Sequence, residues 1–246
     1  SGGYAVRGET SVGWILFMWR RRCVVVGGGL VLLDDSRRHG AGVRSGERPV
    51  DEIVRPTDLP FLCLAPANID LIGAEVEMIS LSERETRLRE ALGVTTGEYE
   101  YVIIDCPPSL SLLTINALTA AESVLVPLQC EYFALEGLSQ LLTTIDLIKN
   151  NFNSSLRLEG ILLTMYSSRT NLSRQVASEV REHFSDSVFH TVIPRNVRLS
   201  EAPSFGKPVI LYDVRSSGAE AYFSFAREVI SNDQKSTGEG PEGPHP

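Results

Sequence analysis

Residues 99–113 read Tyr-Glu-Tyr-Val-Ile-Ile-Asp-Cys-Pro-Pro-Ser-Leu-Ser-Leu-Leu. The run 101–104 is uninterrupted, β-branched and aromatic, which is typical of a strand buried on both faces of a parallel sheet. Asp105 follows this run directly, and Pro107 and Pro108 prevent the strand from continuing. We therefore expect a central strand that ends in a carboxylate.

The position of Asp105 indicates a ligand site. The carboxyl ends of the strands in an open α/β sheet border the crevice where ligands bind, and a carboxylate there can hold a water molecule of a Mg²⁺ ion beside phosphates. The simpler alternative is an aspartate that caps the following turn and helix, and for a lone aspartate the cap is the commoner role.

Strand and helix patterns alternate from Glu47 onward. The strand patterns cover residues 61–65, 101–104, 123–128, 158–165 and 188–193. The helix patterns cover residues 82–93, 112–121, 135–152, a segment from 171, and 218–230. Ser82 and Glu85 have the spacing of a capping box for the first of these helices. This alternation predicts an α/β fold, a parallel sheet with helices on both faces.

The chain of 246 residues divides into three segments by composition. Residues 1–46 are rich in glycine and arginine and atypical, residues 47–231 form one α/β domain, and residues 232–246 have nothing to bury and predict a disordered tail.

Charge and cysteine usage restrict the function classes. A net charge of −8 means that any DNA contact requires a local basic patch. The four cysteines form no CxxC pair, and neither they nor the histidines have the spacing of metal ligands. The apolar run 12–19 is too short to cross a bilayer. We expect a cytoplasmic protein without a membrane segment.

Glycines at positions 27–29 follow three valines, as in a dinucleotide-binding turn. The third glycine of the G-x-G-x-x-G pattern is replaced by Leu32, and a glycine-rich loop is the simpler interpretation. A Rossmann oxidoreductase, with Glu47 at the distance of the ribose-binding acidic residue, is kept as the weakest alternative.

Three long phrases carry a family resemblance. They are Val-Ile-Ile-Asp-Cys-Pro-Pro-Ser-Leu at 102–110, Pro-Leu-Gln-Cys-Glu-Tyr-Phe-Ala-Leu-Glu-Gly-Leu at 127–138, and Thr-Val-Ile-Pro-Arg-Asn-Val-Arg-Leu-Ser-Glu-Ala-Pro-Ser at 191–204. Ser-Arg-Thr-Asn-Leu at 168–172 and Gly-Lys-Pro at 206–208 stand in the expected order. From about Glu47 to Ile230 the chain closely resembles the ParA/Soj chromosome-partitioning ATPases of the ParA/MinD class.

The resemblance implies a P-loop ATPase that dimerises around ATP and Mg²⁺ and binds DNA without sequence preference in that state. It implies a ParB-like centromere-binding partner that stimulates hydrolysis, and an association with the nucleoid. Asp105 would be the Walker B residue that orients the water shell of Mg²⁺. Pro194 and Asn196 would lie near the adenine, and Arg169 and Arg198 would contact the DNA backbone.

The N-terminal segment departs from this family. The family's Lys-Gly-Gly-x-Gly-Lys-Thr-Thr loop, which cradles phosphates, has no counterpart here. Asp35 falls where the first switch I aspartate belongs, but Arg37 replaces the second. Either the nucleotide site is degenerate, or a damaged reading frame precedes an intact remainder. The abrupt onset of family sequence near Glu47 favours the damaged frame.

Two main functions follow. The first is an ATP-dependent partitioning switch, in which Asp105 and Asp35 serve the ATPase reaction. The second is a fragment or pseudo-ATPase that keeps the fold but cannot hydrolyse ATP and acts as an interaction module. Because the loop lysines are missing, the sequence does not decide whether the chain hydrolyses ATP. A measurement of nucleotide binding discriminates between the partitioning switch and the pseudo-ATPase.

Overall fold

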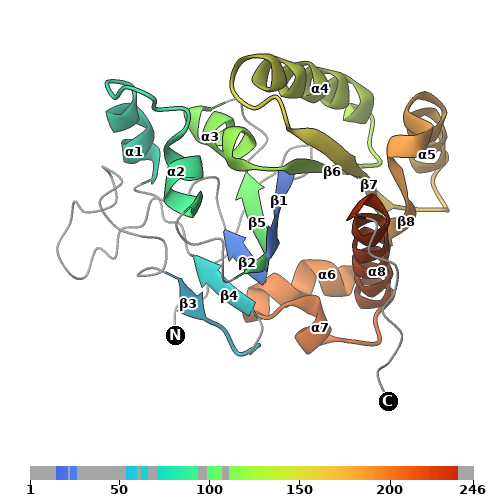
Figure 1. Cartoon of the computed structure of the whole chain (residues 1–246). Helices are drawn as coiled ribbons and strands as arrows, with labels where there is room; N and C mark the ends of the chain where they lie inside the picture. Colours follow the sequence, from blue (N-terminus) through green and yellow to red (C-terminus); the bar gives the residue numbers. More distant parts are fainter. Residues whose placement is uncertain are drawn as a thin grey trace. The chain divides into compact units, whose positions relative to one another are not determined.

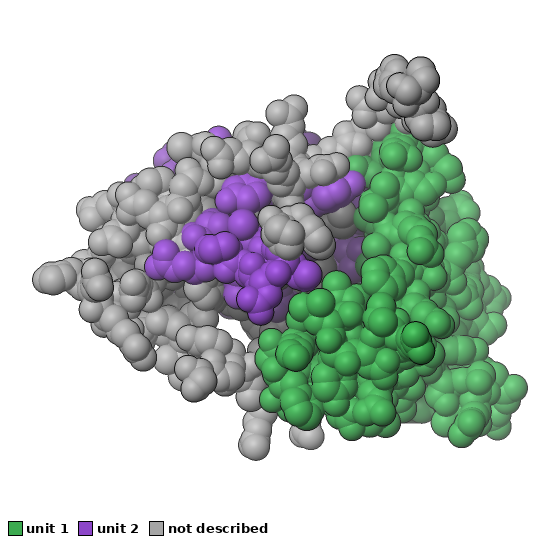
Figure 2. All heavy atoms as spheres, turned by 90° about the horizontal axis from the view of Figure 1, so that it is seen from below, with its two compact units in different colours: residues 1–12, 127–135, 160–246 green, residues 13–126, 136–159 purple. Residues whose placement is uncertain are grey.

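The structure is a computed structural model that describes residues 15–21, 23–26, 54–59, 62–65, 71–93, 99–106 and 111–237. The chain forms two compact units, which are described separately (Figure 2). Unit 1 contains residues 1–12, 127–135 and 160–246, and unit 2 contains residues 13–126 and 136–159. Asp35, the glycines at 27–29 and most of the atypical N-terminal segment lie outside the described residues.

Unit 2 contains most of the strands and the first helices of the chain (Figure 1). Its strands are β1 (Ile15–Arg21), β2 (Cys23–Val26), β3 (Arg55–Pro56), β4 (Leu62–Ala65), β5 (Glu100–Cys106) and the first part of β6 (Ser123–Gln129). Its helices are α1 (Leu71–Met78), α2 (Arg87–Gly93), α3 (Leu112–Ala120) and most of α4 (Ala134–Asn151).

The strands of unit 2 follow the order β3-β4-β2-β5-β1-β6. Strand β2 pairs in parallel with both β4 and β5. Strand β1 runs antiparallel to β5 and β6, and β3 runs antiparallel to β4. The predicted parallel sheet is therefore present at β4-β2-β5. No strand direction was predicted for β1, which lies antiparallel between β5 and β6.

The core of unit 2 forms where β5 and β6 meet α3 and α4. Val102, Ile104 and Leu118 are almost completely buried, and burying a side chain of this size stabilises the fold by about 1.5–3 kcal/mol. The buried side chain of Asn153, which follows α4, donates hydrogen bonds to the carbonyl oxygens of Leu118 (3.0 Å) and Ala121 (2.8 Å). Asn153 thereby satisfies two carbonyl groups at the C-terminus of α3 that no helical N–H can reach.

Helix α2 begins five residues later than the sequence predicts, and the predicted capping box is wrong. Glu83 has φ +53°, a left-handed conformation that a helix cannot contain. The side chain of Glu85 pairs with Arg84 at 2.9 Å. Residues 82–86 therefore form turns, and α2 starts at Arg87 with Leu88 and Leu92 buried.

Unit 1 contains the end of β6 and the part of the chain from residue 160 onward. Its elements are most of β7 (Arg157–Tyr166), α5 (Asn171–Phe184), η3 (Ser185–Ser187), β8 (Val188–Pro194), α6 (Val197–Glu201), η4 (Ala202–Phe205), α7 (Val209–Tyr212) and α8 (Ser217–Thr237). Strands β7 and β8 are parallel, and α8 packs along β8. The short elements α6, η4 and α7 were not predicted.

Strand β8 contains an irregularity that α8 stabilises. Between the pairs Ile161–Val188 and Leu163–Val192 the register of β8 shifts by two residues. The carboxylate of Glu228 on α8 accepts hydrogen bonds from the backbone N–H groups of His190 (2.6 Å) and Thr191 (2.9 Å). Glu228 therefore supplies acceptors for N–H groups in the stretch where the ladder is interrupted.

Helix α8 extends farther than predicted. It begins at Ser217 and ends at Thr237, so residues 232–237, predicted to belong to a disordered tail, are helical. No glycine or proline occurs between Gly218 and Gly238, and nothing in that stretch breaks the helix. Val229 on this helix is buried, whereas Tyr222 and Ala226 are exposed.

Candidate functional site

Asp105 lies one residue before the end of β5, with β2 and β1 as the neighbouring strands. Val102, Ile104 and Cys106 on the same strand are buried, whereas Asp105 is half-buried on the opposite face. Burial raises the pKa of the Asp105 carboxyl from 3.8 to about 6. Burial, reinforced by the charge of Asp105, also raises the pKa of the Cys106 thiol, which therefore stays protonated and serves packing.

The pKa is raised because burial disfavours the ionised carboxylate, and no described residue forms an ion pair that would offset this effect. Among the described residues Asp105 makes no ion pair, and they contain no cluster of three His, Cys, Asp or Glu side chains. A divalent cation or its water shell would supply this compensation. The residue type, its place at the strand end and its desolvation therefore fit Mg²⁺.

Helix α3 is held at its N-terminus by a side chain from α1. The cap residue Ser111 makes no side-chain capping bond, and instead the Glu75 carboxylate accepts the backbone N–H of Leu112 at 2.8 Å. The buried Asn116 amide adds bonds to the backbone of Leu88 (3.2 Å) and Arg84 (2.7 Å), which ties α3 to the start of α2. These bonds fix α3, the next helix in the chain after Asp105 and the end of β5.

A second polar group lies in unit 1, where β8 ends at Pro194. The backbone N–H of Arg195 donates to the carbonyl of Tyr166 (2.9 Å), and its guanidinium pairs with Glu131 (2.9 Å). The Asn196 side chain caps α6 by accepting the N–H of Arg198 at 2.8 Å. These bonds fix the Pro-Arg-Asn turn at both ends.

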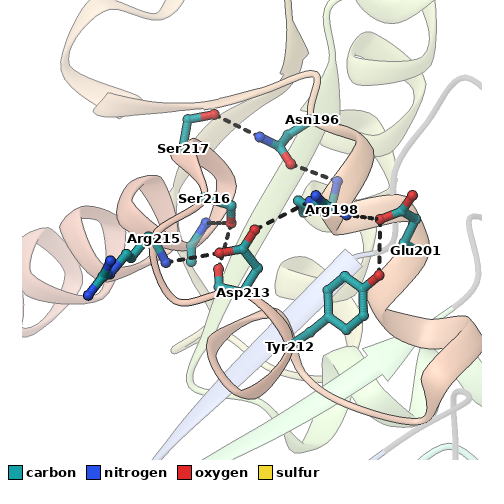
Figure 3. Close-up of polar contacts among 9 residues, drawn as sticks. Asn196, Arg198, Glu201, Tyr212, Asp213, Arg215, Ser216 and Ser217 are labelled. Atoms are coloured by element: carbon teal, nitrogen blue, oxygen red, sulfur yellow. Dashed lines mark hydrogen bonds and ion pairs between the residues drawn. The ribbon is translucent and has the colours of Figure 1, made fainter.

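Asn196 is largely committed to structure. Besides the cap, its amide nitrogen donates to the Ser217 hydroxyl at the start of α8, at 2.7 Å (Figure 3). One lone pair on its oxygen and one N–H remain for a ligand. Pro194, which has no N–H, offers a ligand its carbonyl oxygen and its ring.

Arg198 lies among carboxylates. Its Nη1 donates to Glu201 at 2.8 Å, and its Nε lies 3.3 Å from Asp213 (Figure 3). Glu201 also accepts the hydroxyl of Tyr212 at 3.1 Å. The hydrogen bond from Arg198, followed by that from Tyr212, lowers the pKa of Glu201. Glu201 is therefore ionised at neutral pH and opposes the charge of Arg198.

Arg169 has a different environment. It is exposed in the turn between β7 and α5, and it makes no ion pair with any residue that the structure describes. The turn is closed by hydrogen bonds from Thr170 to the carbonyl of Ser167 and from the N–H of Ser167 to Ser173 (3.0 Å). Within the described part of the chain, Arg169 thus presents an unopposed guanidinium on a fixed turn.

The sequence-predicted residues therefore fall into two groups. Asp105 stands in unit 2, and Arg169, Pro194, Asn196 and Arg198 stand in unit 1. Sequence analysis missed Glu75, Glu131, Glu201 and Asp213. Only Glu201 carried a usable signal, because it stands three residues after Arg198 in a short helix. Within the described part of the chain, no helix is long and apolar enough to cross a membrane.

Comparisons with known proteins define the family. Residues 33–158 match the family described as an AAA domain. The chain is 58% identical over 187 residues to "Chromosome partitioning protein ParA" of Myxococcus xanthus. The matched stretch covers 76% of this chain and 66% of that protein. The chain is 57% identical over 183 residues to "Sporulation initiation inhibitor protein Soj" of Bacillus subtilis, which covers 74% of this chain and 72% of that protein.

A solved structure shows the same fold. Cobyrinic acid a,c-diamide synthase from Mycobacterium smegmatis, with bound ATP analog and magnesium, superposes with a TM-score of 0.70 and 35% identity. The superposition covers 91% of this chain and 87% of that one. The predicted class, a P-loop NTPase-like α/β fold with a parallel sheet and helices on both faces, is confirmed.

Proposed function

Because the chain belongs to the ParA/Soj family of chromosome-partitioning ATPases, we propose that it is an ATP-dependent chromosome or plasmid partitioning protein. In this proposal ATP drives dimerisation, the dimer binds DNA without sequence preference, and a ParB-like centromere-binding partner resets it by stimulating hydrolysis. The protein acts in the cytoplasm, on the nucleoid. The family assignment also sets aside the Rossmann oxidoreductase.

The observation that carries the proposal is the desolvated carboxylate of Asp105 at the end of β5. We assign Asp105 to the water shell of Mg²⁺. Bound Mg²⁺ neutralises the charge that develops on the phosphates during phosphoryl transfer. Asp105 orients that shell from the end of β5, and Glu75 holds the N-terminus of α3, the helix that follows in the chain. Asp35 is assigned to the same reaction through its switch I position.

The adenine is assigned to the turn that follows β8. Pro194 and Asn196 contact it through the groups that their structural bonds leave available: the proline ring and carbonyl, and the second N–H of the Asn196 amide. The cap and the Ser217 bond hold this amide in one orientation, so the turn is already shaped before the nucleotide binds.

DNA binding is assigned to Arg169 and Arg198. An acidic chain can still bind duplex DNA when a few arginines release counterions from phosphates, and such binding is independent of sequence and steeply sensitive to salt. Dimerisation doubles the number of arginines that face the duplex. DNA binding should therefore depend on ATP.

The test is DNA retardation across a salt series, using a variant in which the family's Lys-Gly-Gly-x-Gly-Lys-Thr-Thr loop is restored. We expect binding that requires ATP, and Arg169→Ala or Arg198→Ala should weaken it and lower the salt slope by about 1 for each phosphate that the variant no longer neutralises. Unchanged retardation by the double alanine variant would remove both arginines from this role.

The second candidate is an interaction module that keeps the fold without hydrolysing ATP. The absence of both loop lysines from the sequence favours it for this chain as written. The two candidates differ in nucleotide affinity, which calorimetric titration measures directly.

A further inference from the structure

Arg198 is the more enclosed of the two arginines assigned to DNA. Two carboxylates, Glu201 on its own helix and Asp213 after α7, contact its guanidinium through Nη1 and Nε (Figure 3). The Arg198 side chain is nevertheless 52% exposed, so a phosphate can approach it. The guanidinium is therefore accessible to an anion, but its charge is already opposed by two others.

The two carboxylates are held in place by further bonds. Glu201 Oε2 accepts the hydroxyl of Tyr212 as well as Arg198 Nη1. Asp213 Oδ1 accepts the N–H of Arg215 at 3.3 Å, which leaves Oδ2 facing Arg198. Each acidic group therefore has a second hydrogen-bond partner besides Arg198.

A phosphate that binds Arg198 must compete with these fixed carboxylates. Strong charge-assisted hydrogen bonds to Nη1 and Nε would have to be shared or broken, and the approaching anion meets two negative charges. Arg169 carries no such cost, since it has no ion partner among the described residues. The two arginines are therefore unequal as phosphate ligands.

We propose that Glu201 and Asp213 compete with DNA phosphates for Arg198 and so restrain the DNA binding of this chain. This inference rests on the DNA-binding role proposed above and adds its regulation. Any event that draws either carboxylate away from Arg198 frees this guanidinium for a phosphate. In a dimer each such event counts twice.

The variants that test this are Glu201→Gln and Asp213→Asn. Each removes one negative charge and keeps an oxygen that can accept the hydrogen bond from Tyr212 or from the N–H of Arg215. The matched control is Glu182→Gln, which removes the same charge from an exposed position on α5 where no ion pair is formed with the described residues. Glu182→Gln therefore measures the effect of net charge alone.

The measurement is binding of a fluorescent duplex by the chain as it exists and, with ATP present, by the variant with the restored phosphate-binding loop, starting at low salt of about 50 mM and continuing through a salt series. We expect Glu201→Gln and Asp213→Asn to bind more tightly than Glu182→Gln, with a salt slope steeper by about 1 for the additional phosphate bound. In the Arg198→Ala background, Glu201→Gln should gain no more than the control does. This double-mutant comparison assigns the gain to Arg198.

The outcomes separate the inference from the function beneath it. No DNA binding by the parent or any variant, either as written or with the phosphate-binding loop restored and ATP present, refutes both. Binding that Arg198→Ala leaves unchanged refutes the role of Arg198. Binding that Arg198→Ala weakens but Glu201→Gln and Asp213→Asn fail to strengthen beyond the control refutes the competition alone, and weaker binding by these two variants would show that the carboxylates orient Arg198 for DNA.

A measurement without DNA tests the ion pairs themselves. Arginine-specific dicarbonyl reagents attack a free guanidine, so in the parent Arg198 should be modified more slowly than Arg169, as read by peptide mass spectrometry. Glu201→Gln should speed modification of Arg198 and leave Arg169 unchanged. Equal rates at both arginines in the parent, unaltered in Glu201→Gln, would overturn the proposal.

Discussion

Replacing Asp105 by asparagine should make the protein more stable at alkaline pH and leave its stability unchanged at acidic pH. The folded-state pKa of Asp105 is raised from 3.8 to about 6 because burial disfavours the charged form. Between these two values the folded protein binds more protons than the unfolded chain, so its stability falls as pH rises. Above about pH 6 the loss is complete.

A shift of about two pKa units corresponds to about 3 kcal/mol. Asp105 is only half-buried, and solvent screening reduces the expected effect to about 1–2 kcal/mol. Asparagine has nearly the same shape and no charge. It should therefore recover this amount at about pH 8 and almost nothing near about pH 3, where the aspartate is largely protonated in both states.

The assay is urea unfolding of the parent and of Asp105→Asn, monitored by circular dichroism at several pH values between about pH 3 and about pH 8 in the absence of Mg²⁺. With a slope of about 2–3 kcal/mol/M, the unfolding midpoint of the variant should rise by about 0.5 M at the alkaline end. Asp146→Asn, which changes an exposed carboxylate on α4, is the control and should shift little at any pH. An Asp105→Asn effect that is independent of pH, or a loss of stability at the alkaline end, would show that the buried charge of Asp105 does not destabilise the fold.

Three further changes test other parts of the molecule. In the variant with a restored phosphate-binding loop, Asp105→Ala should fold normally but lose Mg²⁺-dependent ATP turnover; a variant that unfolds, with normal turnover per folded molecule, would indicate that Asp105 is a structural cap. Asn153→Ala leaves two buried carbonyls without donors and should lower the unfolding free energy by about 2–4 kcal/mol, whereas Asn151→Ala, which removes an exposed bond of the same kind, should cost under about 1 kcal/mol in the same urea assay. Gly160 has φ +155°, and Gly160→Ala places a Cβ 2.6 Å from the ring of Phe189, so this change should destabilise the fold by about 1–3 kcal/mol and lower the thermal midpoint. Gly73→Ala, in a helix with open space around it, should be neutral or stabilising. Equal effects of the two glycine changes would contradict the packing argument.

The strands and long helices of this chain could be predicted from sequence because their signals are local. The predicted strand at 188–193 is β8, and the predicted helix at 135–152 is α4, each with ends displaced by at most one residue. Apolar periodicity needs no knowledge of the rest of the fold. The class of the fold followed from this alternation.

The capping box failed for a physical reason that the sequence does not reveal. Ser82 and Glu85 have the required spacing, but Glu83 adopts a left-handed backbone conformation and the chain turns there. The start of α2 at Arg87 depends on the Asn116 amide, which stands 28 residues after Leu88 in the chain. Tertiary contacts of this kind override local capping signals.

The candidate site was predictable in part. Asp105 was identified by its strand and its motif, whereas the magnitude of its desolvation depends on neighbours that only the fold assembles. Arg198 was identified by its motif, but its partner Asp213 stands beyond α7, a helix of four residues with no sequence signal of its own. The contribution of Asp213 to the charge that opposes Arg198 could therefore not be predicted from the sequence.

The most direct test of the proposed nucleotide site is calorimetric titration of Mg²⁺ and a non-hydrolysable ATP analogue into two proteins, the chain as written and the variant with the family's phosphate-binding loop restored. Asp105 alone cannot hold a triphosphate without the loop's N–H groups and lysines. We predict weak or no binding by the chain as written and micromolar or tighter binding, lost in Asp105→Ala, by the restored variant. Micromolar binding by the chain as written, or none by the restored variant, would contradict this prediction.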